Sequence, residues 1–400
     1  MAKMTVRDIA AGGKCALVRV DYNVPLDDHQ QITDDTRITA SLPTLQHLLQ
    51  QGASLVLMSH LGRPKGKRVP EMSLKPAAQR LGELLGRPVP LAPDCIGVEV
   101  EAMAARLQPG QVLMLENLRF YKEEEANDRE FAGRLASLGA LYVNDAFGTA
   151  HRAHASTEGV THFVSPSVAG LLMEKEITYL ADTFANPARP FVAILGGAKI
   201  SGKLEVIQNL LDKVDVLLIG GGMAYTFLKA QGLEIGKSLL EADLLDTALA
   251  TVKRARDKGV ELLLPVDTVV ADRFAADART QVVDANRIPA DWEGVDVGPK
   301  TRALFAGKVR AARTVVWNGP MGVFEMEPFA TGTNELARVL AEATDKGTVS
   351  IIGGGDTASA VAQAGVAERM THISTGGGAS LEAMGGLVLP GVAALTDKEG

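Results

Sequence analysis

Short, continuously apolar segments constrain the fold of this 400-residue chain more than any other feature of its sequence. Each is rich in Val, Ile and Leu, and each leads into a polar or glycine-rich turn and then into a stretch with helical periodicity. Segments that are apolar on both faces are typical of strands buried in a parallel sheet, so we predict doubly wound, Rossmann-like α/β domains. The expected strands are 16–20, 54–58, 112–115 and 141–144 in the first half, and 191–195, 216–220, 261–265, 314–318 and 349–353 in the second.

Two domains are expected, because the chain is longer than one hydrophobic core usually supports and a single sheet would hold too many strands. Residues 165–190 separate the two sets of strands. Val168, Leu171, Ile177 and Leu180 keep approximate helical spacing there, and prolines on both sides limit the helix. The sequence therefore predicts two domains that face a cleft and are joined by one connecting helix.

Charge and composition exclude several kinds of protein. With 41 Lys and Arg against 48 Asp and Glu, the formal net charge is -7, which disfavours binding nucleic acid through a general basic surface. Cys15 and Cys95 form neither a CxxC pair nor a zinc-type cluster, which is typical of a reducing compartment. No run approaches the roughly 18 apolar residues of a membrane span, and the amino terminus has no apolar signal segment. We therefore expect a cytoplasmic, soluble protein without a membrane partner, and nothing requires more than a monomer.

Cationic and polar residues gather just after the expected strands of the first half. Ligands of an open parallel sheet bind beyond the carboxyl ends of its strands, and the planar fork of arginine suits phosphate and carboxylate. A small molecule with several negative charges is therefore the expected ligand, although each arginine taken alone could be a solvated surface residue. Asp21 and Asn23 could be turn residues, or they could bind hydroxyl groups of the ligand. The full set is Asp21, Asn23, Arg37, His60, Arg63, Arg119, His151 and Arg152.

Glycine-rich turns follow the expected strands of the second half, at 196–203, 220–225, 318–325, 353–357 and 375–380. Glycine lets a ligand approach the backbone, and helix starts bind anions, so this pattern indicates a nucleotide site. Glycine-rich turns also serve as plain tight connections in α/β proteins. Several of them within one domain favour the nucleotide interpretation.

Two nucleotide-binding motifs match this half only in part. Residues 197–203 follow P-loop spacing, but Leu204 stands where a P-loop needs Ser or Thr for Mg²⁺. The segment from Gly353 fits G-x-G-x-x-A, yet residues 374–378 lack the acidic residue that would hold the ribose of a dinucleotide. A P-loop NTPase and an NAD-dependent dehydrogenase are thus disfavoured, whereas Asp356 at a helix start could hold Mg²⁺ beside phosphates. The alternative from another class is a two-lobed protein that closes on an anionic metabolite without catalysis.

The ordered motifs of the chain resemble those of phosphoglycerate kinases from one end to the other. They include RVDYNVP (19–25), DDTRI (34–38), SHLGRP (59–64), MLENLRF (114–120), NDAFGTAHRAHAST (144–157), GGAK (196–199), GGGMA (220–224), NGPMGVFE (318–325), GGGDT (353–357) and LPGVAAL (389–395). The resemblance implies a glycolytic kinase that transfers the acyl phosphate of 1,3-bisphosphoglycerate to MgADP, giving 3-phosphoglycerate and ATP reversibly. It also implies a phosphoglycerate-binding domain (1–166), an interdomain helix (167–186), a nucleotide-binding domain (187–375) and a segment that returns to the first domain (376–400).

The resemblance also implies roles for individual residues. The catalytic set would be Arg37, Lys199, Gly376 and Gly377, and Asp356 would ligate the Mg²⁺ that accompanies ADP or ATP. The acid substrate would contact Asp21, Asn23, Arg37, His60, Arg63, Arg119 and Arg152. The nucleotide would contact Lys199, Lys203, Gly220, Gly221, Gly222, Asn318, Pro320, Val323, Glu325, Gly354, Gly355, Asp356 and Thr357. Family members often carry an acidic residue where Gly202 stands, which is a local departure.

This chemistry needs no general base, because neither an ADP phosphate oxygen nor a carboxylate carries a proton that must be removed. Phosphoryl transfer depends mainly on positioning and on neutralising charge, so cations, backbone amides and a metal suffice. The expected anion and nucleotide sites lie on different domains. The reactants would therefore meet only when the domains close.

Overall fold

The computed structural model of the chain describes residues 2–398. Its contacts divide the chain into two compact units: unit 1 is Met1–Thr178 with Val388–Gly400, and unit 2 is Tyr179–Leu387. Helix α6 (Leu171–Ala185) begins in unit 1 and continues into unit 2. A connecting helix is therefore present, but it begins later than predicted, because Ser167–Ala169 form a strand that contains Val168.

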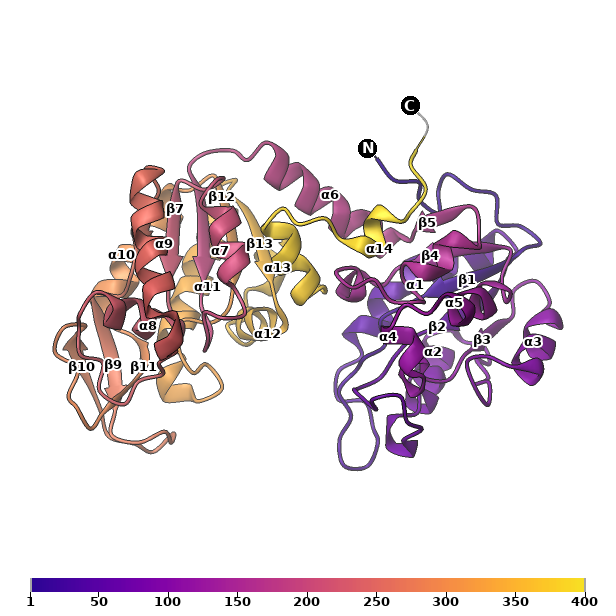
Figure 1. Cartoon of the computed structure of the whole chain (residues 1–400), viewed down its shortest axis with the longest axis horizontal. Coiled ribbons are helices and arrows are strands. Elements are labelled where there is room, and N and C mark those ends of the chain that lie inside the picture. Colours follow the sequence, from indigo (N-terminus) through magenta and orange to yellow (C-terminus); the bar gives the residue numbers. More distant parts are fainter. Residues whose placement is uncertain (1, 399–400) are drawn as a thin grey trace. The chain divides into compact units, whose positions relative to one another are not determined.

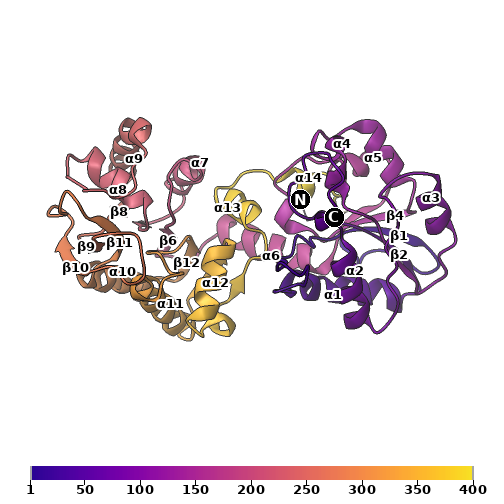
Figure 2. The same cartoon turned by 90° about the horizontal axis from the view of Figure 1, so that it is seen from below.

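Unit 1 contains a five-stranded parallel sheet with the order β3-β2-β1-β4-β5. The helices α1 and α2 cover one face of this sheet, and α4 and α5 cover the other (Figures 1 and 2). Its strands are almost wholly buried, as their apolar sequences predict. The elements are β1 (Cys15–Arg19), α1 (Thr36–Gln50), β2 (Ser54–Met58), α2 (Lys75–Leu85), α3 (Val98–Ala105), β3 (Val112–Met114), α4 (Lys122–Glu125), α5 (Arg129–Ala136), β4 (Leu141–Asn144), β5 (Ser167–Ala169) and α14 (Pro390–Ala393).

Unit 2 contains a six-stranded parallel sheet with the order β14-β13-β12-β6-β7-β8 and a separate antiparallel sheet with the order β10-β9-β11. Helices α7, α8 and α9 lie on one face of the larger sheet, and α10, α11 and α12 lie on the other (Figure 2). The elements are β6 (Phe191–Leu195), α7 (Leu204–Leu210), β7 (Val216–Ile219), α8 (Met223–Ala230), α9 (Leu245–Asp257), β8 (Glu261–Leu263), β9 (Asp267–Ala271), β10 (Thr280–Asp284), β11 (Glu293–Val297), α10 (Pro299–Ala311), β12 (Thr314–Asn318), α11 (Thr331–Thr344), β13 (Val349–Gly353), α12 (Gly355–Gln363), β14 (His372–Ile373) and α13 (Gly378–Met384).

The carboxyl-terminal segment returns to unit 1 from Val388 onward. The Thr396 amide donates to the Ser167 carbonyl at 2.8 Å, and Lys3 Nζ donates to the Ala393 carbonyl at 2.8 Å. Helix α13, earlier in the segment, contacts α7 in unit 2. The contact division thus starts the return later than residue 376, and the functional boundaries at 166, 186 and 375 stay predictions.

The doubly wound α/β fold is confirmed, and every expected strand is present. The antiparallel sheet and the short strands β5 and β14 were not predicted. Strand β10 is largely exposed and polar, and β14 has only two residues, so neither carries a long apolar run. No helix within residues 2–398 is both long enough and apolar enough to cross a membrane.

Candidate active site

The cationic residues of unit 1 lie beyond the carboxyl ends of its strands. Arg19 ends β1, His60 follows β2, and Arg119 lies in the 3-10 turn that follows β3. Strands β1 and β4 are neighbours, but the chain moves from β1 to β2 on one side and from β4 to β5 on the other. Such a switch point is where an open α/β sheet forms its ligand crevice.

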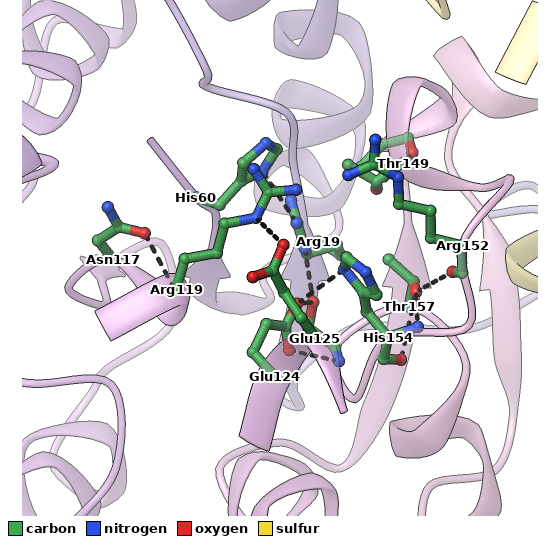
Figure 3. A network of polar contacts seen from close by, with 12 residues as sticks. Arg19, His60, Asn117, Arg119, Glu124, Glu125, Thr149, Arg152, His154 and Thr157 are labelled. Carbon is green, nitrogen blue, oxygen red and sulfur yellow. Dashed lines mark hydrogen bonds and ion pairs between the residues drawn. The ribbon is translucent and has the colours of Figure 1, made fainter. Parts of the chain in front are cut away.

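Arg19 is the centre of a buried hydrogen-bond network (Figure 3). Its fully buried guanidinium donates from Nε to Ser156 Oγ (2.8 Å), from Nη1 to the Val20 carbonyl (2.5 Å) and from Nη2 to His60 Nδ1 (3.1 Å). Glu124 is also fully buried, and its carboxylate accepts from the Ser156 amide (3.0 Å) and hydroxyl (2.5 Å). The carboxylate and the guanidinium therefore share Ser156, and each compensates a buried charge that would be costly alone.

The contact from Arg19 fixes the tautomer of His60. A guanidinium carries donors only, so His60 Nδ1 must accept, and the ring proton lies on Nε2. Burial lowers the pKa of His60 well below its usual value, and the charges of Arg19, Arg119 and Arg37 lower it further. His60 is therefore a neutral ring whose Nε2–H has no partner within residues 2–398.

Arg119 and Arg152 add further guanidinium groups to this edge. Arg119 donates from Nη1 to the Gly62 carbonyl at 2.9 Å. Its buried Nε has no hydrogen-bond partner among residues 2–398 and lies 3.6 Å from the Glu125 carboxylate. Arg152 Nε donates to His151 Nε2 (3.0 Å), so this imidazole also accepts. Burial lowers the pKa of Arg119, and burial followed by the charge of Arg152 lowers the pKa of His151. Guanidinium donors without partners, among neutral imidazoles, suit a ligand with several negative charges.

Asp21, Asn23, Arg37 and Arg63 form the more exposed part of the same cluster. Arg37, in the first turn of α1, donates from Nη1 to Asp21 Oδ2 at 2.7 Å. Asn23 Oδ1 accepts from the Gly62 amide at 2.8 Å, and Gly62 is also the residue that binds Arg119. Arg63 is exposed and forms no hydrogen bond or ion pair with the described part of the chain. The structure thus brings together the residues that were predicted for this edge.

Lysine and glycine residues form the corresponding edge in unit 2. Strands β6 and β12 are neighbours at the switch point of the larger sheet. Lys203 Nζ bridges them, because it donates to the carbonyls of Gly196 after β6 (2.7 Å) and of Asn318 at the end of β12 (2.9 Å). Burial lowers the pKa of Lys203 to about 8, and the nearby Asp356 carboxylate opposes this effect. A cation held at a switch point is well placed to bind phosphate.

Close approach of backbone segments explains the glycines of the adjoining turns. Gly221 has a φ of +66°, and a Cβ there would lie 2.5 Å from the Gly197 amide nitrogen. The Gly197 amide donates to the Pro320 carbonyl (2.9 Å), and the Gly221 amide donates to the Met321 carbonyl (3.1 Å). These bonds tie the turns after β6, β7 and β12 into one layer. In contrast, a Cβ at Gly202 would meet nothing within 4 Å, so the departure from the family pattern strains nothing.

The other predicted nucleotide-site residues follow strands of the same sheet. Thr357 is buried in α12, and its hydroxyl accepts from the Gly319 amide at 2.7 Å. The exposed residues are Lys199, Glu325, Gly355 and Asp356; Val323 and Gly354 are half-buried, and Pro320 is buried. Gly376 and Gly377 follow β14, and Gly377 has a φ of +46°.

Comparison with known proteins gives a consistent result. The sequence profile described as "Phosphoglycerate kinase" matches residues 6–387. A phosphoglycerate kinase of Chloroherpeton thalassium is 60% identical over 397 residues, which cover 99% of this chain and 100% of the relative. A cytosolic phosphoglycerate kinase of Triticum aestivum is 61% identical over 385 residues, which cover 96% of each chain. The chain belongs to the phosphoglycerate kinase family.

Solved structures of phosphoglycerate kinases agree with this assignment. The structure of the Coxiella burnetii protein matches with a TM-score of 0.87 at 43% identity, over 98% of each chain. The Pyrococcus horikoshii structure matches with a TM-score of 0.85 at 32% identity, also over 98% of each chain. The family predicted from the ordered motifs is therefore confirmed, together with its two Rossmann-like units.

A divalent cation fits the phosphoglycerate kinase site only in company with a nucleotide. Within residues 2–398, no group of three or more His, Cys, Asp or Glu residues could hold a metal alone. Asp356 is exposed in the first turn of α12, beyond β13. Mg²⁺ usually takes one or two carboxylates and completes its shell with water and substrate phosphates. The single carboxylate of Asp356 beside a phosphate site is consistent with this coordination preference.

Several contributors to the two edges were missed by sequence reasoning. Arg19 lies inside an apolar run and was treated as part of a strand, although an arginine inside such a run is itself a signal of a buried ionic contact. Glu124, in KEEE, has the sequence appearance of a solvated helix face. Glu241 accepts from the amides of Ile200 (2.6 Å) and Ser201 (3.1 Å) and so holds the turn after β6, but no local pattern indicates this contact.

Proposed function

We propose that this protein transfers the acyl phosphate of 1,3-bisphosphoglycerate to MgADP and forms 3-phosphoglycerate and ATP, reversibly. The observation that carries the proposal is the family match over residues 6–387, because this span includes both the arginine cluster of unit 1 and the lysine and glycine turns of unit 2. The relatives described above carry the name of this activity. The partners are therefore small molecules, and we propose a monomer that acts in the cytosol, as the name of the wheat relative states for that protein.

The acid substrate is expected at the carboxyl ends of β1 to β4. Arg63, Arg119 and Arg152 would bind its phosphate and carboxylate oxygens, since their guanidinium groups retain donors that no side chain of the cluster uses. His60 would donate from Nε2. Asp21 and Asn23 would accept a hydrogen bond from the substrate hydroxyl group. Asp21 also accepts from Arg37 Nη1 and so orients that guanidinium.

The nucleotide is expected over the turns after β6, β7, β12 and β13. Lys203, Asn318 and the amides of residues 354–357 would bind its phosphates, and the glycines at 220–222 would let the nucleotide approach the backbone. Glu325 would accept from the ribose, with Pro320 and Val323 against the ribose or the base. Asp356 would hold Mg²⁺, which supplies neutralisation of phosphate charge when it is bound with the nucleotide.

Transfer itself would rest on positioned positive charge. Arg37 and Lys199 would contact the transferring phosphoryl group, and the turn at Gly376 and Gly377 would lie beside it, with the Gly377 amide as a donor to its oxygens. The Gly376 amide donates to Ser374 Oγ at 3.1 Å. Neither nucleophile carries a proton, so the chain needs no general base. The ligands occupy different units, so the units must close for the reaction to occur. Small-angle scattering should show a smaller radius of gyration with both ligands than with one, and an unchanged radius would contradict closure.

A coupled assay tests the proposal. ATP should form from ADP and enzymatically generated 1,3-bisphosphoglycerate only when the protein is present, and Arg37→Ala should reduce kcat by at least about 100-fold because a transition-state contact is lost. Arg106→Ala is the matched control, since Arg106 is exposed and precedes the amino end of β3. Binding of both ligands without ATP formation would favour the non-catalytic binding protein instead.

A further inference from the structure

A cavity lies in unit 2 between α10 and α11, which pack against each other below the larger sheet in Figure 2. Its volume is about 400 Å³, within the range of small-molecule sites. The interior is apolar and buried, and it is formed by Phe305, Ala306, Met321, Leu336 and Val339. None of the residues assigned to the acid substrate or the nucleotide lines it.

The rim of this cavity carries more cationic than acidic groups. Arg302 Nη1 pairs with Glu335 at 3.1 Å, and Arg310 lies 3.9 Å from Glu342. Arg338 is exposed, and its side chain forms no hydrogen bond or ion pair within residues 2–398. Both acidic groups of the rim thus already have an arginine partner, and the guanidinium of Arg338 remains without a carboxylate.

Arg302 adds a second unsatisfied donor. Its Nε is buried and has no hydrogen-bond partner in the structure. A buried N–H without an acceptor is unfavourable, and a ligand oxygen that reaches it would relieve that cost. An apolar interior with two available guanidinium donors at its rim suits a small molecule with an apolar body and one negative charge.

The floor of the cavity is bonded directly to the nucleotide turns. Met321 lines the cavity, its carbonyl accepts from the Gly221 amide at 3.1 Å, and its amide donates to Thr333 Oγ1 of α11 at 3.0 Å. The Met321 side chain also fills the space beside Gly220, where a Cβ would lie 2.5 Å from its sulfur. Any ligand that displaces Met321 must therefore shift the turn after β7.

We propose that this cavity is a regulatory site for a small monoanion with an aromatic or branched aliphatic body, and that its occupation changes the affinity of the protein for nucleotide through Met321. The site stands on its own lining, whereas its coupling to nucleotide rests on the proposed function. Because coupling between two binding sites is reciprocal, MgADP must change the affinity for the monoanion by the same factor.

The experiment uses naphthalene-1-sulfonate as the probe and the full chain labelled at its methionine methyl groups with ¹³C. Met321→Leu identifies the Met321 signal. The probe should shift this signal saturably, and the uncharged naphthalene-1-sulfonamide should bind at least 10-fold more weakly. Arg338→Gln should weaken probe binding at least 10-fold, while Arg256→Gln, an exposed arginine on α9 at the opposite face of the sheet, should leave it unchanged.

Two further measurements separate the site from its coupling. Ala303→Trp should abolish probe binding without unfolding the protein, because Ala303 is exposed and lines the cavity. Titration calorimetry should show that saturating probe changes the MgADP dissociation constant at least threefold. A missing Met321 shift, or a shift that Arg338→Gln leaves intact and MgADP competes away, would overturn the site. An unchanged MgADP dissociation constant together with a normal Met321 shift would overturn the coupling alone. A lack of ATP formation in the coupled assay would leave the Met321 measurement valid.

Discussion

Replacing Lys203 by Met should weaken nucleotide binding and yet make unit 2 no less stable at neutral pH. Lys203 is a half-buried residue, and within residues 2–398 the hydrogen-bond partners of its ammonium group are two neutral carbonyl groups. Met has a similar length and no charge. The substitution therefore removes a phosphate ligand together with a charge that the fold does not pair with a contacting carboxylate.

The size of the effect follows from the pKa of Lys203. Burial lowers this pKa from its ordinary value of 10.5 to about 8, which corresponds to about 3 kcal/mol of free energy against the charged form. Loss of the two hydrogen bonds costs about 2 kcal/mol, and Asn318 O keeps the Gly196 amide as a second donor. At pH 7 the free energy of unfolding of the variant should therefore be about 1 kcal/mol higher than that of the wild type.

The pH dependence gives the sharper test. Between about pH 8 and 10.5 the unfolded chain binds a proton at Lys203 that the folded chain has lost, so wild-type stability must rise with pH in this window. Relative to Lys203→Met, the wild type should gain about 3 kcal/mol, and the two stabilities should cross near pH 9.

Urea unfolding followed by tryptophan fluorescence measures this difference, because both tryptophans, Trp292 and Trp317, belong to unit 2. Lys253→Met, at an exposed position of α9, is the control and should show no such crossing. The MgADP dissociation constant of Lys203→Met should rise at least about 10-fold, as expected for a lost charge-assisted contact. Parallel pH curves for Lys203→Met and wild type, or an unaltered MgADP constant, would refute the argument.

Other positions offer equally direct tests. His60→Gln can place an amide donor near the position of Nε2 and should keep kcat/KM within about 10-fold of wild type. His60→Asn should lose about 100-fold in kcat/KM, since a hydrogen bond to a charged group is worth about 1.5–3 kcal/mol. Equal losses would contradict the assignment of the ring proton to Nε2. Gly221→Ala should destabilise unit 2 to urea by at least about 2 kcal/mol because of its positive φ and the crowded backbone, while Gly202→Ala should change nothing measurable. Burial raises the pKa of Asp145 to about 6, and its Oδ2 has no partner. The folded state thus binds an extra proton between pH 3.8 and about 6, so the free energy of unfolding falls as pH rises through that window. At pH 8, Asp145→Asn should have a free energy of unfolding about 1–3 kcal/mol above that of the wild type and a higher melting temperature. A lower melting temperature would be the contrary result.

The parallel sheets could be predicted because their strands are buried on both faces and therefore read as unbroken apolar runs. Strand 314–318, for example, was predicted to the residue. Strand β10 could not be found this way, because three of its five residues are exposed and the other two are partly buried, so it has no continuous apolar run. The predicted site residues were chosen because each lies just after a strand along the chain, and ligands of parallel sheets bind beyond the carboxyl ends of the strands.

The interior of the acid-substrate cluster was beyond sequence reasoning for a different reason. Arg19 and Ser156 are 137 positions apart, and Glu124 and Ser156 are 32 apart, so no spacing links them. Buried charged groups that share a hydrogen-bond partner come together only after the chain has folded. The exposed ligands could be anticipated from their place after each strand, whereas the groups that hold them could not.

The crowding of like charges in unit 1 explains why this edge should bind a polyanion tightly. Burial and then the charges of Arg19 and Arg119 lower the pKa of His60 well below its usual value and that of His154 to about 3. Burial and then the charge of Arg19 lower the pKa of Arg119 itself. Glu124 is the fully buried carboxylate of this network within residues 2–398, and it accepts from the amide and the hydroxyl of Ser156. Burial raises its pKa, and the charges of Arg19 and Arg119 oppose that effect. A ligand that brings several negative charges replaces mutual repulsion with attraction, and any ligand that binds only the folded state stabilises it in proportion. Repulsion among the cations of this edge destabilises the empty protein, and its relief on binding of the acid substrate adds to the affinity for that substrate.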